Sequence, residues 1–226
     1  MSDVVVVAPH PDDAEIGCGA TLAMAARRGQ DVLVVDLTAG ELSSNGDPAT
    51  RAAEAAAAAR VLGVRRQCLG LPDRGIGSDP GHSRSLAALL RSERPRLVLG
   101  PRDDDPHPDH RAAAMLTAAA VFDAGLGRLH LAGLPAHRVS AVWYYAVRGD
   151  WSPSFLLDAS DGHDAKVAAL GCYKSQFGAG QVATPLNRGF VAALCGRDAW
   201  WGSLVGVAFA EGFGGPRPPL LSGWPT

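Results

Sequence analysis

The sequence predicts an α/β fold, in which a Rossmann-like and mostly parallel sheet is flanked by helices. Short apolar, β-branched runs alternate with helical segments over four units of the first half, as in parallel sheets with crossover helices. The run at 4–8 is apolar throughout, and the run at 31–37 (DVLVVDL) is apolar apart from two aspartates, which is typical of strands buried on both faces. A chain of 226 residues with 47% hydrophobic residues can form one such core, so we predict a single domain over 1–226.

The boundaries of the first four units follow from turn and cap residues. Two helices should begin at Asp-Pro pairs, Asp47-Pro48 and Asp79-Pro80, because aspartate caps a helix and proline suits its first position. Gly29 is a natural stop for the first helix. The predicted strands of this half lie at 4–8, 31–37, 66–71 and 96–100, and the helices at 16–27, 48–62, 80–94 and 108–124.

Beyond Gly125 the alternation becomes irregular. Here we predict strands at 139–147, 154–158 and 203–209 and helices at 161–174 and 187–201. The Pro/Gly-rich tail at 214–226 should lie on the surface or at a subunit contact.

Composition excludes several classes of partner. Lys and Arg total 21 against 23 Asp and Glu, so no basic excess is present to bind a phosphate backbone. No apolar run approaches the roughly 20 residues of a membrane helix, and the N-terminus lacks the positive segment of a signal peptide. The four cysteines form no C-x-x-C pair, which favours reduced thiols in a cytoplasmic protein.

Two clusters of His and Asp follow the first and fourth predicted strands. The first is HPDD at 10–13 and the second is DPHPDH at 105–110. In the strand order 3-2-1-4 these strands are neighbours, and their carboxyl ends form the crevice where ligands bind. Two His and one carboxylate can hold zinc and leave a position open for water, while a further carboxylate takes a proton and a further His faces an oxyanion. Spacing alone does not decide whether His107 or His110 is the ligand.

HPDDAEIG at 10–17 and DPHPDH at 105–110 resemble the LmbE-like, or PIG-L, family of zinc-dependent N-acetylglucosaminide deacetylases. Four further segments resemble its bacillithiol-biosynthesis branch, which releases acetate from N-acetylglucosaminyl-malate. They are DLTAGELSSNG at 36–46, LPDRG at 71–75, YKSQF at 173–177 and AEGF at 210–213. The resemblance extends over nearly the whole chain.

The resemblance implies a role for each polar residue of the two clusters. His10, Asp13 and His110 would be the metal ligands, Asp12 the general base and His107 the donor to the oxyanion. Asp109 would hydrogen-bond to His107 and keep it charged and oriented. Zinc is the expected metal, and Fe²⁺ or Mn²⁺ could occupy the same ligands.

Three further residues are candidates for binding the substrate. Arg51 matches the substrate-binding arginine of the family and lies in the first turn of a predicted helix, where the helix dipole disfavours a cation. A malate carboxylate is a suitable partner for its guanidinium group. Glu41 and Asp73 lie in the loops after the second and third strands and would accept hydrogen bonds from sugar hydroxyls, or else brace those loops.

Several alternatives remain open at this point. The same chemistry could act on N-acetylglucosamine or on chito-oligosaccharides. A metal-dependent phosphoesterase is disfavoured because the chain lacks a cluster of basic residues for phosphate, and a non-catalytic sugar-binding Rossmann module would need no metal. The family resemblance also implies a homo-oligomer, such as a hexamer.

Overall fold

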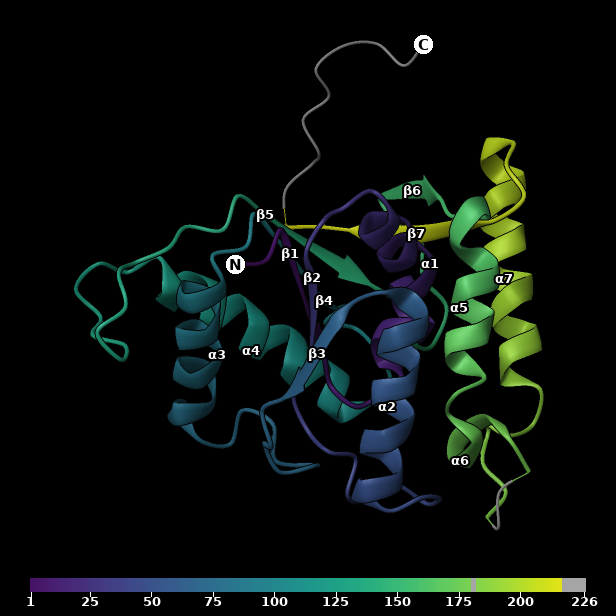
Figure 1. Ribbon diagram of the computed structural model, residues 1–226, viewed down its shortest axis with the longest axis horizontal. Coiled ribbons are helices and arrows are strands. Elements are labelled where there is room, and N and C mark those ends of the chain that lie inside the picture. The colour runs from purple at the N-terminus through teal and green to yellow at the C-terminus, as the bar shows by residue number, and fades with distance from the viewer. Residues whose placement is uncertain (180–181, 217–226) are drawn as a thin grey trace.

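A single seven-stranded sheet forms the centre of the protein and helices cover both of its faces (Figure 1). The computed structural model describes residues 1–179 and 182–216. The strands are β1 Val4–Ala8, β2 Val32–Asp36, β3 Arg65–Cys68, β4 Leu97–Pro101, β5 Ala141–Tyr145, β6 Phe155–Asp158 and β7 Ala210–Gly214. The α-helices are α1 Asp13–Arg27, α2 Pro48–Leu62, α3 Pro80–Glu93, α4 Pro108–Ala124, α5 His163–Leu170, α6 Lys174–Phe177 and α7 Phe190–Val205, and a 3₁₀ turn, η1, covers Ser160–Gly162.

The order of the strands brings β1 and β4 side by side. The sheet runs β3-β2-β1-β4-β5-β7-β6, and β1 to β5 are mutually parallel. Only β7 runs antiparallel to its neighbours, β5 and β6. The predicted fold class and the order 3-2-1-4 are therefore confirmed, and the loops after β1 and β4 leave the sheet at the same edge.

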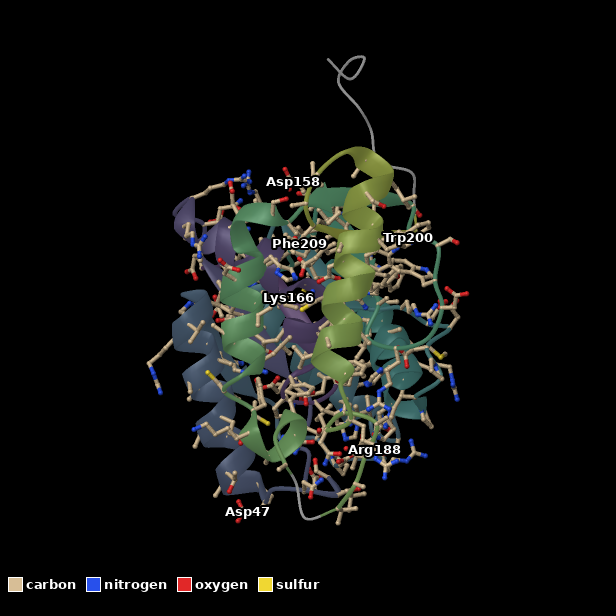
Figure 2. All side chains as sticks on the ribbon, turned by 90° about the vertical axis from the view of Figure 1, so that its right-hand side faces the viewer. Asp47, Asp158, Lys166, Arg188, Trp200 and Phe209 are labelled. Atoms are coloured by element: carbon tan, nitrogen blue, oxygen red, sulfur yellow. The ribbon has the colours of Figure 1, made fainter. Side chains whose placement is uncertain are left out.

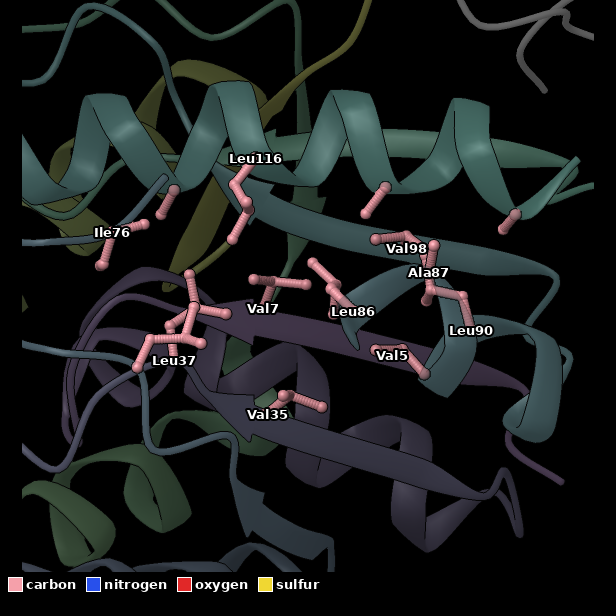
Figure 3. Close-up of a cluster of buried hydrophobic side chains, with 14 of the residues drawn as sticks. Val5, Val7, Val35, Leu37, Ile76, Leu86, Ala87, Leu90, Val98 and Leu116 are labelled. Carbon is pink, nitrogen blue, oxygen red and sulfur yellow. The ribbon is translucent and has the colours of Figure 1, made fainter. Parts of the chain in front are cut away.

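The core has two main layers, one on each face of the sheet. On one face α3 and α4 pack on alternate side chains of the central strands, including Val5, Val7 and Val35 (Figure 3). The intervening side chains, such as Val6 and Val34, face α1, α5 and α7. Because β1 and β2 are buried at every position, their residues are apolar on both faces, apart from Asp36 at the end of β2.

The Asp-Pro pairs begin helices as predicted. The side chain of Asp47 accepts a hydrogen bond from the backbone N–H of Thr50 at 2.7 Å, and that of Asp79 accepts one from Gly81 at 2.7 Å. Each proline takes the first position of its helix, where no backbone donor is needed.

The last predicted strand, at 203–209, is wrong. Helix α7 continues to Val205 and ends where Gly206 adopts φ 77°, and the strand lies later, in β7. Strand β7 contains Gly212 and Gly214, which are uncommon in strands, so its sequence does not show a strand pattern. At both glycines a neighbouring side chain packs closely against the backbone. A Cβ at Gly212 would lie 2.9 Å from the Pro153 ring, and one at Gly214 would lie 3.0 Å from Trp151. The predicted helix at 161–174 is also divided, into η1, α5 and α6.

Helix α1 contains a break that a buried charge cluster supports. Cys18 has non-helical angles (φ −148°, ψ 18°), so the helix restarts after it. The Glu211 carboxylate accepts hydrogen bonds from the backbone N–H groups of Ala20 and Thr21, at 3.1 and 2.8 Å. Lys166, labelled in Figure 2, donates to Glu211 at 2.7 Å and to Asp198 at 2.6 Å. Side chains from α5, α7 and β7 thus meet at the restart of α1.

Within residues 1–179 and 182–216, no helix combines the length and the apolar character needed to cross a lipid bilayer. Most of the Pro/Gly-rich tail, for which we predicted a surface position or a subunit contact, lies outside the described residues.

Candidate metal centre and active site

The loops after β1 and β4 bring two histidines and a carboxylate together. Oδ2 of Asp13 lies 3.1 Å from Nδ1 of His10 and 3.3 Å from Nε2 of His110. His10 leaves the end of β1, Asp13 begins α1, and His110 lies in the first turn of α4. The topology therefore joins residues about a hundred positions apart, as the sequence predicted.

These three residues fit a divalent cation. Their ligand atoms all lie within 4.8 Å of one another, and the set of two nitrogens and one oxygen leaves a coordination position open for water. Burial acts to lower the pKa of His110, but the Asp13 and Asp105 carboxylates raise it to about 9. The pKa of His10 is also raised well above its usual value, because bonds to Asp109, Asp13 and Asp73 outweigh its burial. Carboxylates that attract a proton to these rings also attract a metal ion.

Asp12 has an unusual backbone conformation beside this centre. It is 4% exposed and adopts φ 105°, in the left-handed region that non-glycine residues rarely occupy. Burial raises the pKa of its carboxyl group to about 7, although Arg51 acts to lower it. Nη2 of Arg51 lies 3.5 Å from Oδ2 of Asp12. A carboxyl group with such a pKa can both accept and return a proton near neutral pH.

The structure places Asp109 differently from the resemblance. Its carboxylate lies 3.3 Å from Nε2 of His10 and bonds to Arg74 through the backbone N–H (3.0 Å) and Nη1 (3.1 Å). The Asp109 carboxylate makes no hydrogen bond to the His107 ring. Instead, Nδ1 of His107 accepts a bond from the backbone N–H of Asp109 at 3.2 Å. Burial and the neighbouring histidines lower the pKa of His107, so the structure favours a neutral ring with its proton on Nε2 rather than a charged one.

Asp105 has a role that the sequence analysis did not assign. It is fully buried, and its Oδ1 lies 3.0 Å from Nδ1 of His110. The same oxygen accepts from the backbone N–H of His107 at 2.8 Å, and Oδ2 accepts from that of Arg148 at 3.0 Å. A carboxylate behind a ligand histidine fixes its orientation and raises its basicity. The sequence could have indicated this role, because Asp105 is the first residue of the second His/Asp cluster.

A cavity of about 360 Å³ opens above these residues. Of the predicted site residues, Glu41 and Asp109 are not among those that line it. The lining residues are His10, Asp12, Asp13, Leu42, Ser43, Ser44, Arg51, Asp73, Arg74, His107, His110, Arg148, Gln176, Thr184, Pro185 and Leu186.

The three predicted substrate-binding residues have different surroundings. Arg51 lines the cavity but is 2% exposed, and its guanidinium donates to the carbonyl of Pro11 and, at 3.0 Å, to Oγ of Ser43. Glu41 is exposed and accepts from the backbone N–H of Asp73 at 2.6 Å, while Asp73 accepts from that of Leu42 at 3.1 Å. Glu41 and Asp73 thus brace their two loops against each other, and Asp73 also faces His10 at 3.4 Å.

A buried ionic network lies beneath the site and was not predicted. Arg66 of β3 donates to both oxygens of Asp36, at 2.6 and 2.7 Å, and also to Glu15. The Tyr173 hydroxyl donates to Glu15 at 3.0 Å. From the sequence alone, Glu15 is expected only to favour the N-terminus of the first helix. Its carboxylate instead ties α1 to β3 and to the segment before α6.

The fold and this centre define an α/β protein with a candidate site for a divalent metal ion, and comparison with known proteins identifies its family. Residues 5–121 match the PIG-L family model, described as GlcNAc-PI de-N-acetylase. The chain belongs to this family and is, by that membership, an N-acetylglucosaminide deacetylase.

The chain is similar to two named deacetylases and to one solved structure over most of its length. The chain is 33% identical over 192 residues to diacetylchitobiose deacetylase of Thermococcus kodakarensis, covering 78% of this chain and 71% of the relative. It is 30% identical to 1D-myo-inositol 2-acetamido-2-deoxy-alpha-D-glucopyranoside deacetylase 2 of Saccharopolyspora erythraea, covering 76% and 82%. The crystal structure of the conserved protein TT1542 of Thermus thermophilus superimposes with a TM-score of 0.91 at 42% identity, over the full length of both chains.

Proposed function

We propose that this protein is a zinc-dependent deacetylase that releases acetate from N-acetylglucosaminyl-malate. The observation that carries the chemistry is the convergence of His10, Asp13 and His110 on one point, with Asp12 buried beside them. The acidic aglycone is supported by the branch motifs and by Arg148, which lines the cavity.

His10, Asp13 and His110 would hold the metal ion. When bound, such an ion polarises the acetyl carbonyl and acidifies a water molecule. Asp12 accepts the proton of the attacking water and then delivers it to the leaving amine, a task suited to its raised pKa. Nε2–H of His107 donates to the oxyanion, which a neutral ring can do while Nδ1 accepts from the Asp109 backbone.

The remaining residues orient this machinery and the sugar. Arg51 holds the Asp12 carboxylate and contributes to the wall of the sugar site. Asp109 orients His10, and Asp105 orients His110. Asp73 accepts a hydrogen bond from a sugar hydroxyl at the rim of the cavity. Glu41 does not contact the sugar and acts by holding the loop that contains Asp73.

Metal content and acetate release, measured together, test this assignment. Asp12→Asn should keep the metal and lose activity by roughly 10²–10⁴-fold, the usual contribution of a general base. His10→Ala should lose both the metal and the activity. His130→Ala replaces an exposed histidine as the matched control and should keep both. Equal metal content and equal turnover in Asp12→Asn, His10→Ala and the wild type would contradict the proposed roles.

A neutral aglycone is the second candidate, because the relative with 33% identity is named a diacetylchitobiose deacetylase. Comparison of kcat/KM on N-acetylglucosaminyl-malate, diacetylchitobiose and N-acetylglucosamine separates the two. The malate compound should be preferred. A preference for diacetylchitobiose would overturn the acidic aglycone while leaving the deacetylase chemistry intact.

We further propose a single domain, a cytoplasmic location and a homo-oligomeric state. The location is supported by four cysteines that are all free thiols in the structure. The single domain is supported by the one sheet that extends from β3 to β6.

A further inference from the structure

A second hollow, of about 300 Å³, adjoins the metal cavity. Its walls come from the segment after β5 and from the first half of α7. Arg148 and Pro185 line both hollows, so the two lie next to each other at these residues. A ligand that is bound at the metal centre and extends beyond Arg148 would meet the second hollow next.

The second hollow has cationic residues and no acidic residue in its wall. Arg148 and Arg197 line it together with apolar side chains that include Phe190 and Leu194. Arg197 is already neutralised, because its guanidinium donates to Asp198 at 3.2 Å and to the carbonyls of Ile16 and Ala146. The charge that remains uncompensated in this wall is that of Arg148.

The other arginines of the metal cavity are already paired. Arg51 faces Asp12, and Arg74 bonds to Asp109. Within residues 1–179 and 182–216, the Arg148 guanidinium makes no hydrogen bond or ion pair. A half-buried arginine without a counterion at the junction of two hollows attracts an anionic group of a ligand.

The backbone of Arg148 is fixed with respect to the metal ligands. Its N–H donates to Oδ2 of Asp105 at 3.0 Å, and Oδ1 of the same carboxylate lies 3.0 Å from His110. Its carbonyl accepts from Nη2 of Arg102 at 2.8 Å. Asp105 therefore holds both His110 and the backbone of Arg148. This shared partner fixes the distance between the metal centre and the point from which the Arg148 side chain extends.

We propose that the second hollow is the aglycone subsite and that Arg148 binds a carboxylate of an acidic aglycone there. The inference rests on the proposed deacetylase function and deepens it by naming the residue that selects the substrate class. The apolar residues Val147, Phe190 and Leu194 would cover the short carbon chain that carries the carboxylates. A neutral aglycone gains nothing from Arg148, so this residue sets the preference for acidic over neutral substrates.

The test is the ratio of kcat/KM on N-acetylglucosaminyl-malate to that on methyl N-acetylglucosaminide, a neutral analogue. In Arg148→Gln this ratio should fall by roughly tenfold to a hundredfold, the range expected for loss of a charge-assisted contact. Arg148→Lys keeps the positive charge but cannot form the bidentate contact of a guanidinium group. Its kcat/KM ratio should therefore lie between those of Arg148→Gln and the wild type. Arg188→Gln is the matched control, because Arg188 is exposed and lines neither hollow; its ratio should match that of the wild type.

The possible results separate the two proposals. A ratio in Arg148→Gln within twofold of the wild-type value, with normal thermal unfolding, would overturn the subsite while leaving the deacetylase function standing. If the wild-type enzyme releases acetate from neither substrate, the proposed function itself fails. A lower ratio in Arg148→Gln, absent in Arg188→Gln, supports the subsite.

Discussion

Replacement of Lys166 by methionine should destabilise the protein strongly. Lys166 is 1% exposed, and its ammonium group bonds to Asp198 at 2.6 Å and to Glu211 at 2.7 Å. Both carboxylates are fully buried. With Arg197, which pairs with Asp198, the cluster contains two positive and two negative charges, so Lys166→Met leaves one buried negative charge uncompensated.

The expected loss is about 3–5 kcal/mol, which is the usual cost of removing one partner from a buried ion pair. Methionine has a similar stem and volume, so little packing energy is lost with the charge. A loss of this size is a large fraction of the roughly 5–15 kcal/mol by which domains are typically stable. The double variant Lys166→Met/Asp198→Asn has a neutral cluster again and should recover at least half of the stability that Lys166→Met loses.

Urea unfolding followed by circular dichroism, at one protein concentration, measures these changes as shifts of the midpoint. Lys174→Met provides the control, since Lys174 is exposed, and its effect should stay within about 0.5 kcal/mol. The reasoning is refuted if Lys166→Met loses less than about 1 kcal/mol, or if the double variant is no more stable than the single one.

Two further predictions concern the metal ligands and the amino-terminal edge. Asp105→Asn removes the anionic partner of His110, so metal affinity in a chelator competition should fall roughly tenfold to a hundredfold; unchanged affinity would contradict the role of Asp105. The Arg65 guanidinium holds the pKa of Glu93 below its usual value, so the ion pair stabilises the fold above about pH 4.5 and loses this effect as the pH falls. Glu93→Gln should therefore lower the free energy of unfolding at pH 7 by less than about 1 kcal/mol and should have a smaller effect near pH 3; an equal loss at both pH values would exclude this pair as the cause.

The first half of the fold could be predicted because local signals and long-range order agree there. The apolar runs of β1, β2 and β4 and the caps Asp47 and Asp79 each specify their own element. The parallel order then places the loops after β1 and β4 together without further information. The strand β7 was missed because its glycines serve the packing of Trp151 and Pro153, which only the folded chain brings near.

The convergence of most of the predicted residues on one cavity could be foreseen from the sequence, but not all of their contacts. The ligand set of His10, Asp13 and His110 required the family resemblance, since spacing left His107 and His110 equivalent. The partners of Glu15 and Asp109 come from β3 and from the loop after it, and no pattern of one sequence relates such distant positions. Arg148 carries no motif at all, and only the shape of the folded chain distinguishes it.

The left-handed backbone of Asp12 limits which residues can replace it. A conformation of this kind costs on the order of 1–3 kcal/mol in a non-glycine residue, and asparagine and glycine tolerate it best. Glycine at position 12 would relieve this strain, but it would also leave the buried Arg51 guanidinium without its carboxylate partner. The backbone strain and the buried arginine therefore constrain this position together, so a stabilising change at residue 12 is expected to require a second substitution at residue 51.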